Sequence, residues 1–137
     1  MNASSLRVAD YMTRKIVTVS ADTEIMRAVY LLVEKRLSGI PVVSDGHVLV
    51  GMLTERDCLA VAINAGYFDE PGGLVADFMS QPVETVTSQD RVVDIAMRFR
   101  DTQFRRFPVV DSGNLVGIFS RHDVLRALKR GVWFGRR

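Results

Sequence analysis

Residue types that build disulfides, metal centres and catalytic sites are scarce in this 137-residue sequence. Its one cysteine, Cys58, cannot form a disulfide within the chain, and its place beside Leu59 in a helical pattern predicts a small buried apolar residue. The only two histidines are His47 and His122, and no group of His, Cys and carboxylate residues has metal-ligand spacing. A Gly-rich phosphate loop and a nucleophile with a neighbouring base are also missing. The sequence therefore predicts no catalytic residue, no metal and no catalytic cofactor.

Long apolar runs and a large excess of one charge are missing as well. No run approaches the roughly 18 apolar residues that span a bilayer, and residues 1–20 lack the apolar segment of a signal peptide. We therefore expect a cytoplasmic protein without a membrane partner. Lys and Arg total 18 against 16 for Asp and Glu, so the charge balance does not predict a nucleic-acid partner.

What the sequence does contain is one unit repeated. Residues 8–12 (Val-Ala-Asp-Tyr-Met) return as residues 75–79 (Val-Ala-Asp-Phe-Met), an offset of 67, and one extra residue near His47 then reduces the offset to 66. A unit this small buries little surface alone, so two units are expected to share an interface about a pseudo-twofold axis. The predicted division is a repeat at 8–63, a linker at 64–74, a repeat at 75–130 and a tail at 131–137.

Each repeat begins with a short strand and an amphipathic helix. Residues 15–19 and 83–86 are apolar stretches bounded by polar residues, which predicts strands. Apolar residues then recur at helical spacing, and Ser20 or Asp22 could cap the first of the two helices. The expected buried stripes are Ile25, Ala28, Val29, Leu32 and Val33, then Val92, Ile95, Ala96 and Phe99, with Arg91, Asp94, Arg98 and Asp101 on the wet face of the second helix.

A hairpin and a second helix complete each repeat. Apolar runs on both sides of a Gly-containing turn predict antiparallel strands at 40–43 with 48–54 and at 107–110 with 115–119. Pro41 and Pro108 would start their strands, where a missing N–H is tolerated. The last helix would begin near Arg56 or Arg121. The predicted fold class is α+β, with two tandem β-α-β-β-α units.

Three sequence marks occur in order in both repeats. They are an Asp-aromatic-Met start at 10–12 and 77–79, an apolar-Pro-Val-Val strand, and a Gly-x-x-[Ser/Thr]-x-x-Asp run at 51–57 and 117–123. Over residues 8–130 this combination resembles a pair of CBS domains, also called a Bateman module. The resemblance implies a non-catalytic regulatory module, usually a homodimer, that binds an adenosyl ligand in clefts between its repeats. The sequence does not choose among AMP, ADP, ATP, NAD and S-adenosylmethionine, and it does not name the protein effector.

The resemblance also implies two ligand sites, each built crosswise from both repeats. Asp57 or Asp123 could accept hydrogen bonds from both hydroxyls of a ribose, and Thr54 or Ser120 could contact the sugar or phosphate. The same Thr-x-x-Asp and Ser-x-x-Asp spacing is typical of helix capping, and one residue can do both. Site one is expected to contain Lys15, Val17, Leu37, Ser38, Arg106, Ser120, Arg121, His122 and Asp123, and site two Glu84, Phe104, Arg105, Thr54, Arg56 and Asp57.

The two sites are expected to be unequal. Arg105 and Arg106 suit phosphate, whereas the first repeat has Ser38 and Gly39 at these positions. The charge of Glu84 would repel phosphate in site two. A second hypothesis is a ligand-free dimeric scaffold that binds a protein partner, and residues 133–134 (Trp-Phe) could either bind a partner or fold back onto the protein.

Overall fold

The computed structural model describes residues 5–70 and 72–133, and only the backbone of 131–133. The chain forms two compact units: a central unit, Val17–Val83, and a terminal unit that joins Met1–Ile16 to Glu84–Arg137. These units differ from the sequence repeats in one respect. Each Asp-aromatic-Met start packs in the unit that contains the hairpin and helices of the other repeat.

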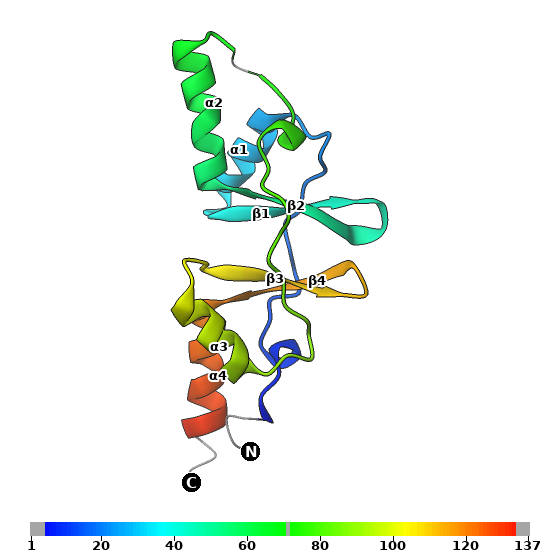
Figure 1. Cartoon of the computed structure of the whole chain (residues 1–137), viewed down its shortest axis with the longest axis vertical. Helices are drawn as coiled ribbons and strands as arrows, with labels where there is room; N and C mark the ends of the chain where they lie inside the picture. The colour runs from blue at the N-terminus through cyan, green and yellow to red at the C-terminus, as the bar shows by residue number, and fades with distance from the viewer. Residues whose placement is uncertain (1–4, 71, 134–137) are drawn as a thin grey trace. The chain divides into compact units, whose positions relative to one another are not determined.

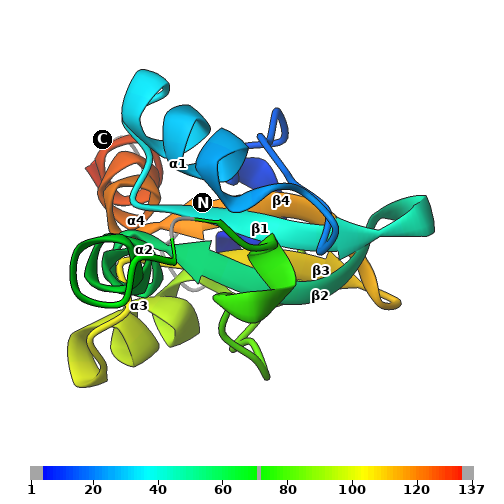
Figure 2. The same cartoon turned by 90° about the horizontal axis from the view of Figure 1, so that it is seen from above.

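The central unit has an antiparallel hairpin and two helices. The elements are α1 (Ile25–Glu34), β1 (Gly39–Ser44), β2 (Val48–Thr54) and α2 (Glu55–Tyr67). Both helices lie on the same side of the hairpin (Figure 1), and the hairpin turn extends away from α2 (Figure 2). The buried stripe of α1 includes Ile25, Ala28 and Leu32, as predicted, but Val33 is 72% exposed. The core between helices and hairpin is aliphatic.

The terminal unit repeats this α+β arrangement with an aromatic core. Its elements are α3 (Val92–Asp101), β3 (Arg106–Asp111), β4 (Asn114–Ser120) and α4 (Arg121–Ala127), followed by a π-helical segment, Leu128–Trp133. The ring centroid of Phe99 lies 4.8 Å from that of Phe107 and 6.2 Å from that of Phe119. The hairpins and the four helices were predicted correctly. The proposed role of residues 133–134 concerns side chains outside the described part of the chain.

The predicted first strands at 15–19 and 83–86 were wrong in extent, because each forms a single parallel bridge. Val19 pairs with β1 through its N–H, which donates to the Pro41 carbonyl at 3.2 Å. Pro41 is the third residue of its strand rather than the first. Because proline has no N–H, it cannot supply the donor that would extend the parallel pairing toward residue 17. Val86 and Pro108 stand in the same relation in the terminal unit.

Two further local predictions need correction. The cap of α1 is Glu24, whose carboxylate accepts the N–H groups of Met26 and Arg27, rather than Ser20 or Asp22. The Ser20 N–H instead donates to the Thr23 hydroxyl at 3.1 Å, which forms a turn before the helix. In addition, α2 continues through Tyr67, so residues 64–67, expected in the linker, are helical. Gly66 is tolerated because it lies in the last turn.

Backbone pairing attaches the two start segments. In the terminal unit Thr13 and Ile118 exchange two N–H···O hydrogen bonds of 2.8 and 2.9 Å. In the central unit Met52 and Ser80 do the same at 3.0 and 2.8 Å. Each segment therefore forms an edge of the hairpin that it joins, and the segment of the central unit also reaches the first turn of α2, where the Ser80 hydroxyl donates to Asp57.

Candidate functional site

The Gly-x-x-[Ser/Thr]-x-x-Asp runs form reciprocal capping boxes at the starts of α2 and α4. The Thr54 hydroxyl accepts the Asp57 N–H at 3.2 Å, and Asp57 Oδ2 accepts the Thr54 N–H at 2.9 Å. Ser120 and Asp123 make the same pair of hydrogen bonds, at 3.2 and 2.9 Å. The capping alternative is therefore confirmed for both aspartates. Each carboxylate is held by one oxygen, with its Oδ1 oriented away from the box.

The Oδ1 atoms of the two aspartates have different partners. Asp57 Oδ1 accepts a hydrogen bond from the Ser80 hydroxyl at 2.9 Å, whereas Asp123 Oδ1 lies 2.9 Å from Nη1 of Arg126. Arg126 corresponds to Ala60 in the first repeat. Asp57 is half-buried, and its Oδ1 contacts a neutral hydroxyl rather than a cation. Asp123 is 5% exposed and forms an ion pair with Arg126. An ionised carboxylate oxygen has about two acceptor lone pairs, so Asp57 retains capacity for another donor.

The segment before each proline lies beside the capping box of its own unit. The Ser38 carbonyl accepts the Glu55 N–H at 2.9 Å, and the Arg105 carbonyl accepts the Arg121 N–H at 3.1 Å. Arg121 Nε also donates to the Phe104 carbonyl at 2.9 Å. The structure thus brings Phe104 and Arg105, predicted for site two, next to Arg121, predicted for site one.

The predicted site residues divide between the two units, and each predicted site draws on both. Their joining into two crosswise sites stays a prediction. The central unit contains Val17, Leu37, Ser38, Thr54, Arg56 and Asp57, and the terminal unit contains Lys15, Glu84, Phe104, Arg105, Arg106, Ser120, Arg121, His122 and Asp123.

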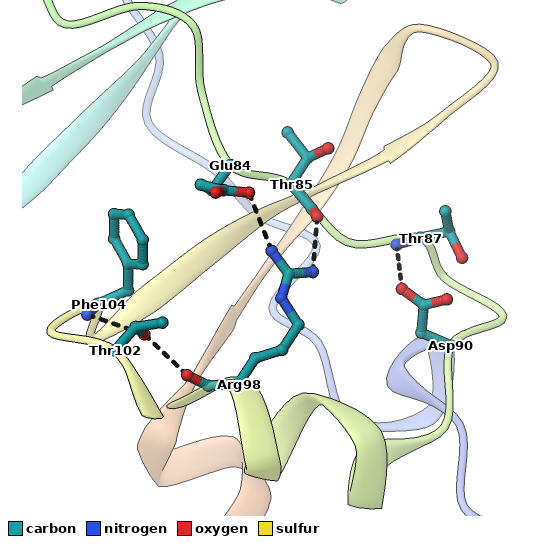
Figure 3. A network of polar contacts seen from close by, with 7 residues as sticks. All are labelled: Glu84, Thr85, Thr87, Asp90, Arg98, Thr102 and Phe104. Carbon is teal, nitrogen blue, oxygen red and sulfur yellow. Dashed lines mark hydrogen bonds and ion pairs between the residues drawn. The ribbon is translucent and has the colours of Figure 1, made fainter. Parts of the chain in front are cut away.

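Arg98 is the functional candidate that sequence reasoning missed. It was expected on the wet face of its helix, but its guanidinium donates to the Thr85 carbonyl at 3.0 Å and to Glu84 Oε2 at 3.2 Å (Figure 3). The guanidinium carbon also lies 4.4 Å from the centroid of the Phe107 ring, in cation–π geometry. Glu84, expected to repel phosphate, is therefore ion-paired. The sequence contained one signal that this position is not simply solvent-facing: the first repeat has the apolar residue Leu31 where the second has Arg98.

A cavity in the central unit was also not predicted. It has a volume of about 730 Å³ and opens between the segment at 18–23, α1 and the hairpin. Its lining combines hydroxyl and carboxylate groups with apolar side chains; Thr18, Arg27, Leu31, Val43, Val50 and Met79 are among the lining residues. Met79 precedes Ser80, the residue that hydrogen-bonds Asp57, so the cavity and the capping box are linked through this segment.

The described residues contain neither a metal-ligand cluster nor a membrane-spanning helix. Within 5–70 and 72–133, no three His, Cys, Asp or Glu side chains are grouped so that they could hold a metal ion. The same part of the chain has no helix with the length and apolar character needed to cross a membrane.

Comparison with known proteins gives consistent matches. A model of the CBS domain family matches residues 8–64 and 75–130. CBS domain-containing protein YhcV of Bacillus subtilis is 35% identical over 118 residues, covering 85% of this chain and 81% of that protein. Protein MJ1225 of Methanocaldococcus jannaschii is 30% identical over 121 residues, covering 88% of this chain and 42% of that protein. This chain therefore spans less than half the length of MJ1225.

A solved structure extends the similarity to three dimensions. The crystal structure of CBSX2 of Arabidopsis thaliana in complex with AMP has a TM-score of 0.81 and 34% sequence identity, and the match covers 91% of this chain and 97% of that one. In the full-length CBSX2 sequence, the match covers 62% of the protein.

Proposed function

Because the chain belongs to the CBS domain family and carries two copies of the domain, we propose that it is a regulatory module that binds an adenine nucleotide or a related adenosyl ligand. CBSX2, 34% identical to this chain, forms a complex with AMP. The ligand class proposed here is therefore AMP, ADP, ATP, NAD or S-adenosylmethionine, which share an adenosine group. No catalytic step is part of the proposal.

The observation that carries the proposal is the state of Asp57. One of its oxygens is fixed by the capping box, and the other accepts a single hydroxyl, at 2.9 Å from Ser80. A ribose presents two neighbouring hydroxyls, and an ionised carboxylate accepts from them more strongly than a neutral group does. Because Asp57 is half-buried and is not ion-paired there, we propose it as the main ribose acceptor. Asp123 would have to exchange its contact with Arg126 to do the same.

The position of the two capping boxes at the starts of α2 and α4 also suggests how ligand binding could be transmitted to another protein. Each ribose acceptor is the cap of a helix, so a bound ligand would change the environment of the first turn of α2 or α4. We propose that a homodimer in the cytoplasm passes this change to a separate protein effector. The ligand would have to bind one state of the assembly more tightly than the other.

A scaffold function is the second candidate, and exposed apolar side chains on the helices favour it. Tyr30 is 62% exposed, Leu59 62% and Tyr67 85%. Such side chains suit contact with another protein. Under this alternative the chain would bind its partner without a nucleotide, and substitutions at the capping boxes would leave partner binding unchanged.

The experiment is a calorimetric titration of the full chain with AMP, ADP, ATP, NAD and S-adenosylmethionine, with GMP as the base control. Asp57→Asn should weaken binding about tenfold or more, because a hydrogen bond to a charged group contributes about 1.5–3 kcal/mol. The matched control is Asp77→Asn, since Asp77 accepts the Leu74 N–H at 2.9 Å in the same geometry but lies outside the predicted sites. If none of the five ligands binds, the ligand-sensing proposal is wrong and the scaffold alternative takes its place.

A further inference from the structure

The two units of the chain carry opposite net charges. The central unit, Val17–Val83, contains four Lys and Arg residues against nine Asp and Glu, a net charge of −5. The described residues of the terminal unit, 5–16 and 84–133, contain twelve Lys and Arg against seven Asp and Glu, a net charge of +5. The near balance of the whole chain therefore arises from two units of unlike charge, which attract each other when they belong to different molecules.

Each unit also exposes large apolar side chains on its helices. In the central unit they recur at helical spacing and form what we call the central stripe: Met26, Tyr30 and Val33 on α1, and Leu59, Ile63 and Tyr67 on α2. The terminal stripe consists of Val93 and Met97 on α3, Leu125 on α4, and Leu128 at the start of the π-helical segment. Both helices of each unit lie on one side of its hairpin (Figure 1) and contact each other, so each stripe lies on a pair of neighbouring helices.

Carboxylates continue the central stripe along both of its helices. Glu34 follows Tyr30 by four residues on α1, and Glu55 precedes Leu59 by four residues on α2. Residues four apart are neighbours on a helix surface, and both glutamates are exposed. An occupant of this stripe would therefore meet an apolar surface bordered by negative charge.

Cations take the corresponding places on the terminal stripe. With a repeat offset of 66, Arg121 corresponds to Glu55, and Leu125 corresponds to Leu59. Lys129 follows Leu125 by four residues, and both cations are exposed. The helices of the terminal unit, with the π-helical segment, carry six Lys and Arg against three carboxylates, whereas those of the central unit carry two against three. The two stripes are thus equivalent in position and complementary in charge.

The occupant that matches both stripes is a second copy of this chain. A homodimer with a two-fold axis can place each unit against its own counterpart or against the other unit of the partner. The first arrangement places like charges beside each other in both units, and like charges across an interface are costly. The second arrangement pairs the acidic unit with the basic unit twice.

We propose that the chain forms an antiparallel homodimer, in which the central stripe of each copy packs against the terminal stripe of its partner. This inference rests on the proposed function for the homodimer and adds which unit meets which. Burial of the apolar side chains would drive the association, and the charges beside them would select the orientation. A protein partner of the scaffold alternative would compete for the same side chains.

Cross-linking of single cysteines in the ligand-free protein tests the orientation. Leu59 and Leu125 are equivalent residues, 62% and 61% exposed, which makes them matched positions for probes. Cys58→Ser removes the only native cysteine from the background. A bismaleimide linker should join Leu59→Cys to Leu125→Cys when the two variants are mixed, with a peptide tag on one of them, and should give little dimer from either variant alone. Dimers from each variant alone, without dimers that join the two, would overturn the antiparallel arrangement.

Charge reversal tests the electrostatic part, with the dimer dissociation constant measured by sedimentation. Glu34→Lys should raise this constant about threefold or more, because each dimer contains the altered contact twice, and Lys129→Glu should do the same. An equimolar mixture of the two variants should recover the wild-type constant, since reversed charges then meet in one contact and native charges in the other. In a parallel dimer Glu34→Lys would exchange one pair of like charges for another, so an unchanged constant would overturn the proposal.

Asp45→Lys is the matched control for charge reversal. It makes the same kind of change in the same unit, at an exposed residue of the hairpin turn, which extends away from α2 (Figure 2). It should dimerise like wild type at about 0.15 M salt, where exposed charges more than about 8 Å apart are largely screened. The wild-type dissociation constant should rise with added NaCl, and a fall would show that like charges meet in the dimer.

The outcomes distinguish this inference from ligand binding. A wild-type chain that sediments as a monomer over the whole concentration range would overturn the antiparallel dimer and the homodimer of the proposed function. Failure of the five adenosyl ligands to bind would overturn the sensing proposal alone, because the cross-links and the sedimentation need no ligand.

Discussion

The side chain of Met12 lies against Gly117, so closely that a Cβ added to this glycine would be 2.7 Å from Met12 Sδ. Met79 covers Gly51 in the same way, with a corresponding distance of 2.6 Å. The methionine of each Asp-aromatic-Met start and the glycine of each Gly-x-x-[Ser/Thr]-x-x-Asp run are therefore two sides of one contact. In both units the two sides come from different sequence repeats.

Gly117→Ala should destabilise the protein by about 1–3 kcal/mol, because the added methyl overpacks the core and meets the Thr13 carbonyl oxygen as well, at 3.1 Å. Urea denaturation measures this difference. In a Met12→Ala background the cost of Gly117→Ala should be smaller, since the main clash is gone. Gly66→Ala is the control, because a Cβ there meets nothing within 4 Å and alanine favours the helix. Wild-type stability in Gly117→Ala would contradict this account of the glycine.

The exchange of start segments shows which parts of the fold local sequence can predict. Periodicity and turn residues indicated the helices and hairpins, because those signals act between near neighbours in the chain. The pairing of Thr13 with Ile118 depends on long-range packing, and two similar repeats offer two equally good partners for each start. The length of the first strands was predictable in principle, since Pro41 and Pro108 lack the N–H that a longer parallel pairing needs.

In the candidate site, too, the features set by local spacing were predictable from sequence and those set by packing were not. The capping boxes follow from a spacing of three residues, and they were recognised from sequence as one of two roles for Asp57 and Asp123. The partners of the two Oδ1 atoms, Ser80 for Asp57 and Arg126 for Asp123, could not be predicted in this way, because they depend on the orientation of side chains. Arg98 was misplaced because its helical position is amphipathic, and a long side chain at such a position can turn toward solvent or toward the strands.

The acid stability of the terminal unit should depend on Asp111. The hydroxyl and the backbone N–H of Ser88 hold the pKa of the Asp111 carboxyl below its ordinary value of 3.8. A depressed pKa in the folded state means that the contribution is complete above the unfolded value and is lost as pH falls through the folded value. The decrease in unfolding free energy between pH 5 and pH 3, by urea titration, should therefore be smaller in Asp111→Asn. Asp45→Asn, at an exposed turn residue, controls for loss of one charge, and equal decreases in both variants would contradict the role of Asp111.

The β3–β4 turn should be improved by a change at Ser112. Ser112 and Gly113 both have positive φ, 52° and 84°, which is the backbone of a type I′ hairpin turn. Asparagine tolerates this region better than serine, and β-branched residues tolerate it worst. We expect Ser112→Asn to raise the thermal midpoint and Ser112→Val to lower it. An unchanged midpoint in Ser112→Val would show that the turn does not hold this conformation in solution.

The thiol of Cys58 should report on the charge of Asp57. Burial, and second the neighbouring Asp57 carboxylate, raise the pKa of this thiol above its ordinary value of 9.0. Because the thiolate is the reactive form, alkylation by iodoacetamide at pH 8 should be slower in the folded protein than in denaturant. Asp57→Asn should accelerate the reaction, since it removes the second cause. Asp77→Asn should react at the wild-type rate, and acceleration there would point to general loosening of the fold.

The ion pair between Arg126 and Asp123 should be worth more than an ordinary surface pair. Asp123 is almost fully buried, so removal of Arg126 leaves its Oδ1 without this donor. Because the Arg126 side chain is about half exposed, water can enter the space that it leaves and compensate for part of this loss. We expect Arg126→Ala to cost about 1–2 kcal/mol of unfolding free energy, a value between those of surface ion pairs and buried ones.

The central unit tolerates Ala60 at this position because Ser80 provides the donor to Asp57. In a double-mutant cycle the cost of Arg126→Ala should therefore fall when Asp123 is replaced by asparagine, whereas the same change at Arg100 should be independent of Asp123. Additive costs for Arg126 and Asp123 would mean that Arg126 acts through its hydrogen bond to the Tyr11 carbonyl instead.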